Sequence, residues 1–282
     1  MKRAPSLEPL PSDEEDLPNC EPLPSDEEED PPCLPCASSP TDLKAASRAA
    51  HKRCMSTMEQ IPVPDGSRGD MLELFAGTGS IGRAFARRDF RTVSLDIATT
   101  KNCTPTVLAD IRAWDFKSSP YQRFDIIWSS PPCTEYSRAR TTANKPRDLE
   151  QADALVKTVF NIVDYYKPKF WFLENPDTGM LKKRPMMTGI RRVRLDYCMY
   201  GTPYRKRTSI WGKFPPSWIP RPLCTGKCGF VTNGRHWSSA QQGSGWNVHE
   251  LHAIPRALCE EIADACKSGL SGAGTRLDPF GR

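Results

Sequence analysis

The sequence predicts an α/β fold in which helices cover an open, mainly parallel sheet, followed by a small irregular C-terminal region. Three observations support this prediction. Short apolar runs of strand length alternate with segments of helical periodicity between residues 70 and 176. The first run enters a glycine-rich turn that leads directly into a helix, and later runs end in acidic or nucleophilic side chains. In an open parallel sheet such side chains meet at one edge, where ligands bind.

The charge of the chain is divided unevenly. The 282 residues carry a net charge of +5, but residues 1–40 hold 2 basic and 11 acidic side chains. Residues 41–282 therefore hold 37 basic and 23 acidic ones, a net charge of +14. A basic domain favours a polyanionic partner, above all nucleic acid, although a solvated basic surface is the plainer explanation. No run of 18 apolar residues is present, so we expect a soluble, intracellular monomer without membrane contact, nuclear if eukaryotic.

Residues 1–40 are expected to form a disordered, acidic, proline-rich tail. A Glu-Pro-Leu-Pro-Ser-Asp-Glu-Glu motif occurs twice, and such a segment buries too little apolar area to offset its chain entropy. Ser12 and Ser25 each precede an acidic run and are candidate phosphorylation sites. The tail either binds a protein partner, shields the basic domain or only solubilises the chain. Residues 41–66 are interpreted as a linker that ends in prolines and a glycine.

The catalytic core is expected over residues 67–212, and it opens with the stretch 70–82. An apolar strand enters a turn with Gly77 and Gly79, which let the backbone approach a ligand closely. Seventeen residues past Gly79, the next strand ends in Asp96, whose carboxylate can accept both hydroxyls of a ribose. Strand, helix and acidic tip together favour a nucleoside-binding site over a purely structural turn.

A third short strand ends in Asp110 and Ile111. The Asp110 carboxylate is placed to meet an adenine amino group if the ligand is an adenosyl compound. Alternatively, Asp110 caps the turn that follows it, and the two roles are compatible.

Cys133 follows the buried strand 124–128 and two prolines. The paired prolines fix two φ angles and remove two backbone donors, so they present the thiol at the sheet edge. The competing interpretation is a small buried core residue. The polar, basic segment 134–147 is suited to close over a polyanion. Asp148 and Gln151 then predict a capping box at the start of a helix that covers the sheet.

Glu174 ends the next buried strand, which spans residues 169–173. It is expected to face Cys133 across a cleft, because both residues end successive strands of one sheet. Residues 195–212 predict two strands joined by a basic turn. In an extended chain Arg205 and Arg207 lie on one face, where guanidinium groups suit a base carbonyl or a phosphate.

Residues 213–253 form either a short recognition region or a zinc knuckle. A Cys-x3-Cys pair, one upstream cysteine and one downstream histidine would complete a tetrahedral Cys3His zinc site, in which His249 or His252 could be a substitute ligand. The alternative is that the cysteines are free thiols. The four residues are Cys198, Cys224, Cys228 and His236. A closing helix is expected over 254–267, before a flexible C-terminus at 268–282.

Together these motifs resemble the DNA cytosine-5 methyltransferase family, S-adenosylmethionine enzymes with a Rossmann-like sheet. Their order and spacing agree from about residue 70 to 212. The matching stretches are Leu74–Gly79, Asp96-Ile97, Asp110-Ile111, Pro132–Ser137, Glu174-Asn175 and Arg205–Arg207. The resemblance implies that S-adenosylmethionine contacts Phe75, Ala76, Gly77, Gly79, Asp96, Ile97, Asp110, Ile111 and Pro132.

The resemblance also implies the chemistry. Cys133 would add to carbon 6 of a flipped cytosine, a protonated Glu174 would donate to ring nitrogen 3, and an arginine of the 205–207 stretch would meet the ring oxygen. Asn175 would hold the backbone of the Cys133 turn. The expected polymer is DNA, with RNA as an alternative.

Two further alternatives remain. An amino-group methyltransferase would place an aromatic residue after the prolines, where this chain has Cys133. A non-catalytic nucleic-acid-binding protein would have no use for Cys133 and Glu174 at neighbouring strand ends.

Overall fold

The computed structural model describes residues 68–138, 145–240 and 245–271. The predicted tail with Ser12 and Ser25, the linker, the middle of the basic segment (139–144) and residues 272–282 lie outside the described residues. In the described part of the chain, no helix has both the length and the apolar character needed to cross a membrane.

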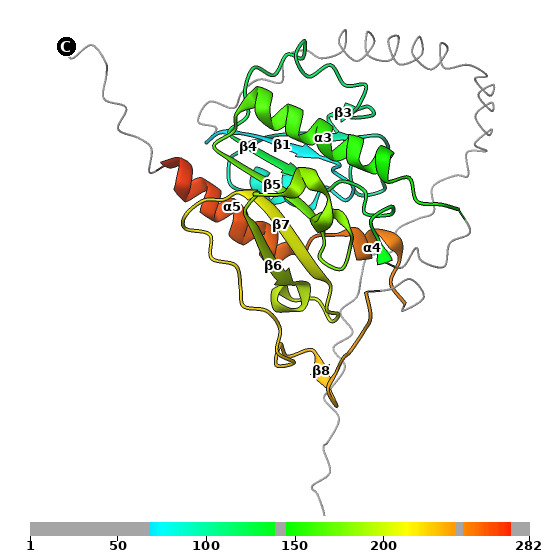
Figure 1. Ribbon diagram of the computed structural model, residues 1–282. Helices are drawn as coiled ribbons and strands as arrows, with labels where there is room; N and C mark the ends of the chain where they lie inside the picture. Colours follow the sequence, from blue (N-terminus) through cyan, green and yellow to red (C-terminus); the bar gives the residue numbers. More distant parts are fainter. Residues whose placement is uncertain (1–67, 139–144, 241–244, 272–282) are drawn as a thin grey trace, which may run out of the picture. The chain divides into compact units, whose positions relative to one another are not determined.

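A seven-stranded sheet forms the centre of the fold (Figure 1). Its order is β3-β2-β1-β4-β5-β7-β6; the first five strands are parallel, and β7 runs antiparallel to both β5 and β6. The α/β prediction is confirmed. The strands are β1 (Asp70–Leu74), β2 (Arg91–Asp96), β3 (Val107–Leu108), β4 (Ile126–Ser129), β5 (Phe170–Pro176), β6 (Arg192–Asp196) and β7 (Arg207–Lys213).

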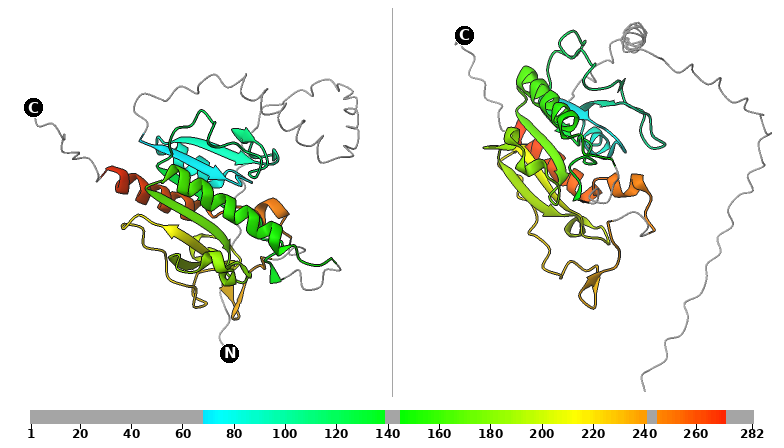
Figure 2. Two further views of the ribbon diagram at one scale, coloured as in Figure 1. Left: turned by 45° about the horizontal axis from the view of Figure 1, so that its top comes forward. Right: turned by 45° about the vertical axis from the view of Figure 1, so that its right-hand side comes forward.

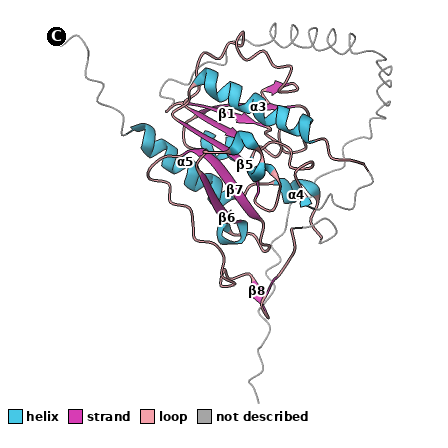
Figure 3. Ribbon diagram, viewed as in Figure 1, coloured by secondary structure: helices cyan, strands magenta, loops and turns pink. Residues whose placement is uncertain are grey.

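Helices cover both faces of this sheet, as Figures 2 and 3 show. Helix α3 (Leu149–Tyr166) packs on one face, and α2 (Ser80–Ala86) and α5 (Arg256–Ser271) pack on the other. Neighbouring residues of β1 divide between the two cores: Met71 belongs to the core under α2 and α5, and Leu72 belongs to the core under α3. This explains why the central strands β1, β4 and β5 are mostly apolar, because they are buried on both sides.

The helix ends differ from the predictions in detail. Asp148 caps α3 by accepting a hydrogen bond from the Gln151 backbone, as predicted. In a capping box the Gln151 side chain would accept from the Asp148 backbone N–H. Here that N–H donates to Oε2 of Glu135 instead, at 2.8 Å. The closing helix was predicted over 254–267 but begins at Arg256 and extends to Ser271. Residues 268–271, predicted as flexible, are therefore its last turn, and Lys169 Nζ donates to the Gly269 carbonyl there.

Short elements make up the remainder. Residues 197–200, predicted to extend a strand, form the 3-10 helix η4 (Tyr197–Tyr200) between β6 and β7. Further along the chain, a two-stranded hairpin and a five-residue helix interrupt an otherwise irregular path. The other short elements are η2 (Leu181–Lys183), η3 (Pro185–Met187), β8 (Val231–Thr232), β9 (Arg235–His236) and α4 (Val248–His252).

Candidate active site

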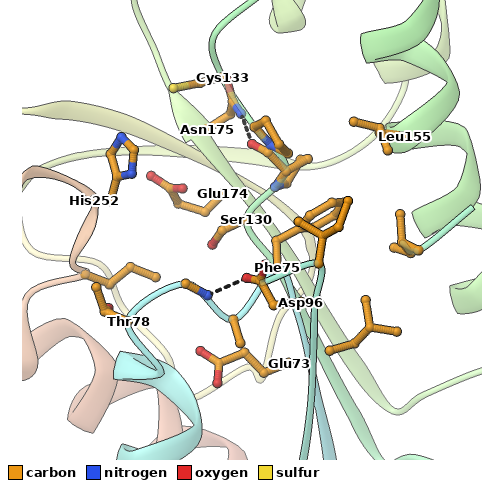
Figure 4. A pocket seen from close by; sticks show the side chains of 18 of the residues that line it. Glu73, Phe75, Thr78, Asp96, Ser130, Cys133, Leu155, Glu174, Asn175 and His252 are labelled. Atoms are coloured by element: carbon orange, nitrogen blue, oxygen red, sulfur yellow. Dashed lines mark hydrogen bonds between the residues drawn. The ribbon is translucent and has the colours of Figure 1, made fainter. Parts of the chain in front are cut away.

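A cavity of about 340 Å³ lies where the parallel strands end. Its walls come from the segments that follow β1, β2, β3 and β4, from the end of β5, and from residues near β7 and α4. Figure 4 shows the side chains that point into it. A volume of this size at the carboxyl edge of an open α/β sheet is typical of a ligand site.

The glycine turn forms one wall of the cavity. Gly77 has a φ of +52°, its N–H donates to Oδ2 of Asp96 at 2.8 Å, and an added Cβ would meet nothing closer than 3.9 Å. The backbone here is open to a ligand, as predicted. Gly79 differs: it does not line the cavity, and an added Cβ would lie 2.9 Å from Sγ of Cys103. Its φ of +65° and the packing against Cys103 require glycine there whether or not a ligand is near, so a ligand contact at Gly79 stays a prediction.

Two predicted acidic positions lie at the same cavity. Asp96 ends β2, and the exposed Ile97 beside it also lines the wall. Asp110 accepts from the backbone N–H of Arg112 at 2.9 Å and pairs with its guanidinium, which lowers the pKa of the Asp110 carboxyl. Asp110 therefore both caps a turn and faces the cavity. Phe75, Ala76, Ile111 and Pro132, the other predicted contacts, line it as well.

These residues fit an adenosyl ligand. An open glycine backbone lies beside a carboxylate that has further lone pairs for ribose hydroxyls, and a second carboxylate lies at the next strand end. Phe75, Leu95 and Ile111 supply apolar surface for a purine ring.

Cys133 lies on the opposite wall, three residues after Ser130 leaves the sheet edge. The turn that carries Cys133 is held by the buried Asn175, whose Nδ2 donates to the Pro131 carbonyl at 3.0 Å, as expected. Burial raises the pKa of the Cys133 thiol, the Glu174 carboxylate raises it further, and the charge of Lys206 opposes both. The thiol is therefore held neutral until something offsets the burial or the Glu174 charge.

Glu174 lines the same cavity as Cys133, as predicted (Figure 4). It does not lie beyond the strand end, because β5 continues through Pro176. The side chain is 7% exposed, and the Tyr197 hydroxyl donates to its Oε1 at 3.0 Å. The position inside a paired strand makes this carboxyl group rigid.

The structure separates the two predicted arginines from the cavity. Arg207 forms a two-pronged ion pair with the fully buried Asp196, both contacts at 2.9 Å, and Arg205 is exposed. Lys206 lines the cavity in their place, and its Nζ donates to the Leu251 carbonyl at 2.9 Å. Side chains alternate along an extended chain, so the same alternation that puts the arginines together puts Lys206 on the other face.

The sequence analysis missed Glu73 as a cavity residue and named His252 only as a substitute metal ligand; both line the cavity, and His252 is not part of the cysteine cluster. Glu73 could have been found from the sequence, because it is a charged residue inside an apolar strand. Burial raises the pKa of Glu73 to about 7, and its Oε2 accepts a hydrogen bond from the Gly82 N–H at 3.0 Å. His252 ends α4, whose capping box between Asn247 and Glu250 is legible in the sequence. Burial, then the charges of Lys206 and His249, lower the pKa of His252.

The four predicted metal ligands come together away from this cavity. The ligand atoms of Cys198, Cys224, Cys228 and His236 all lie within 4.8 Å of one another. No residue of this cluster lines the cavity.

Known proteins resemble the chain in the same region. Residues 69–186 match the family model for "C-5 cytosine-specific DNA methylase". Over 221 residues the chain is 30% identical to a Frog virus 3 (isolate Goorha) protein named "Probable DNA (cytosine-5)-methyltransferase", and the match spans 70% of this chain and 99% of that protein. The chain belongs to the DNA (cytosine-5)-methyltransferase family. The family and the S-adenosylmethionine-dependent enzyme class predicted from the sequence are thereby confirmed.

Two other proteins are similar to smaller parts of the chain. The match to the type II methyltransferase M.AgeI of Thalassovita gelatinovora is 27% identical and covers 50% of this chain but only 38% of that protein. Among solved structures, the Entamoeba histolytica methyltransferase EhMeth overlaps with a TM-score of 0.40 at 17% identity, covering 55% of each chain.

Proposed function

We propose that this protein transfers a methyl group from S-adenosylmethionine to carbon 5 of cytosine in DNA, through a covalent bond between Cys133 and the base. One observation carries the proposal: a cysteine and a carboxyl group line the same cavity as the open glycine turn and Asp96. A nucleophile, a proton donor and a nucleoside site in one cavity are what this reaction requires.

Carbon 5 of cytosine is a poor nucleophile until carbon 6 is attacked. The Cys133 thiol loses its proton to solvent when the base is bound, and the thiolate then supplies an electron pair for a bond to carbon 6. The electrons of the ring double bond move toward carbon 5 and make it reactive. Because burial and Glu174 both raise the pKa of the thiol, Cys133 remains protonated in the absence of a base. A cytosine that engages the Glu174 carboxyl relieves part of that penalty, so activation is tied to binding of the correct ring.

The remaining cavity groups handle charge and protons. When cytosine is bound, Glu174 carries a proton, which it donates in a hydrogen bond to ring nitrogen 3; the Tyr197 hydroxyl holds the carboxyl group in place. The Lys206 ammonium, rather than an arginine, stabilises both the thiolate and the negative charge pushed onto the ring. His252 has a pKa lowered by burial and neighbouring cations, so it is a neutral base available for the proton that leaves carbon 5. The sulfur–carbon bond then breaks and restores the aromatic ring.

The glycine turn, Asp96 and Asp110 would hold the cofactor. Its electrophilic sulfonium would supply the methyl group to carbon 5 and would leave as the neutral thioether. Gly77 would leave room for the ligand, Asp96 would accept from ribose hydroxyls and Asp110 would meet the adenine amino group. The target base is stacked in a duplex, so it must be flipped into the cavity at a cost of a few kcal/mol.

The test is a methylation assay with labelled S-adenosylmethionine on duplex DNA, single-stranded DNA and transfer RNA, followed by nucleoside analysis. The proposal predicts 5-methyl-deoxycytidine in DNA. Labelled N4-methylcytosine or N6-methyladenine would refute the ring chemistry, and methylation of RNA alone would refute the choice of polymer.

A further inference from the structure

The cluster of Cys198, Cys224, Cys228 and His236 lies outside the cavity and has no role in the proposed reaction. Its members come from three places in the chain: Cys198 from η4, the Cys-x3-Cys pair from the loop after Trp218, and His236 from β9. Cys198 and Cys224 are buried, and Cys228 and His236 are half-buried. Three sulfurs and one imidazole nitrogen converge on one point.

The spacing of these atoms matches tetrahedral metal coordination. Nε2 of His236 lies 3.5 Å from Sγ of Cys224 and 3.4 Å from Sγ of Cys228. Metal bonds of about 2.3 Å to sulfur and 2.0 Å to nitrogen, meeting at a tetrahedral angle, place their outer atoms about 3.5 Å apart. With all four donors from the protein, such a site is closed and therefore structural rather than catalytic.

The surrounding backbone is arranged to hold these donors. The N–H of Gly226 donates to Sγ of Cys224 at 3.3 Å, a contact that stabilises a thiolate. The Cys224 N–H donates to the buried Asp196 at 3.0 Å and fastens the loop to β6. Asn233 and Gly234 both have positive φ, which makes the tight turn that places His236 opposite Val231.

This part of the chain lacks a core of its own. Between Ile219 and Glu250, Cys224 is the only described side chain among the buried apolar ones, and Ile219 is 82% exposed. A segment with so little buried apolar area needs another source of folding free energy, and a structural zinc ion provides about 10–16 kcal/mol in small domains.

We propose that Cys198, Cys224, Cys228 and His236 bind one structural zinc ion that fastens residues 219–240 to the sheet beside the active site. The ion has a second consequence, which rests on the proposed function. Cys198 shares η4 with Tyr197, the donor to Glu174, so zinc also fixes the residue that positions the catalytic carboxyl. Tyr197 is a positioning residue in this account.

Metal content of the purified full-length chain tests the proposal without any activity assay. Inductively coupled plasma mass spectrometry should find about one zinc per chain after dialysis against a weak chelator. Cys228→Ser and His236→Ala should each lose most of it. Two matched controls should keep it: Cys33→Ser/Cys36→Ser, which removes the other short cysteine pair of the sequence, and His249→Ala, an exposed histidine outside the cluster.

Cobalt substitution of the wild-type chain covers the case in which a variant does not fold. Tetrahedral thiolate–cobalt absorption in the visible range is expected, and zinc should displace it. A wild-type chain that binds neither metal, or variants that retain full zinc, would overturn the proposal. Zinc binding together with an inactive enzyme would instead count against the proposed function alone. Loss of zinc that lowers kcat but leaves S-adenosylmethionine binding intact is the expected signature of the link through Tyr197.

Discussion

The two walls of the cavity are built in different ways. The cofactor wall consists of parallel strand ends and the turns after them, and β1, β2 and β4 hold it in register through backbone hydrogen bonds. The wall around Glu174 is formed by the antiparallel pair of β5 and β7 and by short pieces, η4 and α4, that carry Tyr197 and His252. The cofactor wall is fixed mainly by the sheet, with one side-chain bond from Asp96 to the glycine turn. The second depends on side-chain contacts between segments far apart in the sequence.

This difference predicts where mutations act. Changes on the cofactor wall should alter binding and leave the reactivity of Cys133 unchanged. Changes on the second wall should alter the chemistry of the thiol and leave cofactor affinity unchanged.

The largest effect is expected for Cys133→Ser. A hydroxyl cannot replace the thiolate as nucleophile at neutral pH, so methyl transfer should fall by more than about 1000-fold. S-adenosylmethionine affinity, measured by isothermal titration calorimetry, should be unchanged, because the thiol is not part of the cofactor wall. A Ser variant that retains full activity would reject the covalent route.

Lys206→Met should reduce the single-turnover rate by about 100-fold, because it removes the cavity-lining cation whose charge lowers the pKa of Cys133 and that would offset charge on the ring. Arg205→Met is the matched comparison, since it removes an equal charge one residue away on the exposed face. At saturating DNA its rate should remain within a few-fold of wild type. Equal losses in both variants would mean that the charge acts at a distance and not in the cavity.

Asp96→Ala should weaken S-adenosylmethionine binding by roughly 10–100-fold, the effect of losing charge-assisted hydrogen bonds of about 1.5–3 kcal/mol. Asp110→Asn should cost less, because the Asp110 carboxylate is already shared with Arg112. Calorimetric titration of both variants gives the two affinities. An unchanged affinity in Asp96→Ala would remove this carboxylate from the cofactor site.

The smallest effect concerns the thiol itself. Glu174 raises the pKa of Cys133, so Glu174→Gln should lower that pKa and speed alkylation of Cys133 by iodoacetamide a few-fold at pH 7. Lys206→Met should slow it, since the lysine acts in the opposite direction. Peptide mapping compares Cys133 with Cys103 of the same sample, whose rate should not change. A slower alkylation of Cys133 in Glu174→Gln would show that Glu174 does not raise the pKa of the thiol.

Sequence patterns predicted the first wall well and the second wall poorly. Strand, glycine turn and acidic tip follow local rules, so Gly77, Asp96 and Asp110 could be placed from spacing alone. Gly79 shows the limit, because a positive φ and the contact with Cys103 require glycine there whether or not a ligand is near.

Which side chains line the wall around Glu174 depends on contacts between residues far apart in the sequence. Arg207 is held by an ion pair with the buried Asp196, which the sequence does not reveal. Side chains alternate along the chain, so Lys206, and not the arginines on either side of it, points into the cavity. His252 arrives on a five-residue helix too short for a periodic pattern. Outside the cavity, the four predicted metal ligands do come together, because a Cys-x3-Cys pair is a recognisable pattern even in an irregular segment; the bound metal stays a prediction.

The central claim is a covalent bond between Cys133 and the cytosine ring, and trapping it is the most direct test. A DNA duplex with 5-fluorocytosine at the target position has no proton at carbon 5 to lose, so the intermediate cannot resolve. With S-adenosylmethionine present, the account predicts a protein–DNA adduct that survives denaturation and maps by mass spectrometry to Cys133. Methylation of ordinary DNA by a chain that forms no such adduct, or an adduct at another residue, would contradict it.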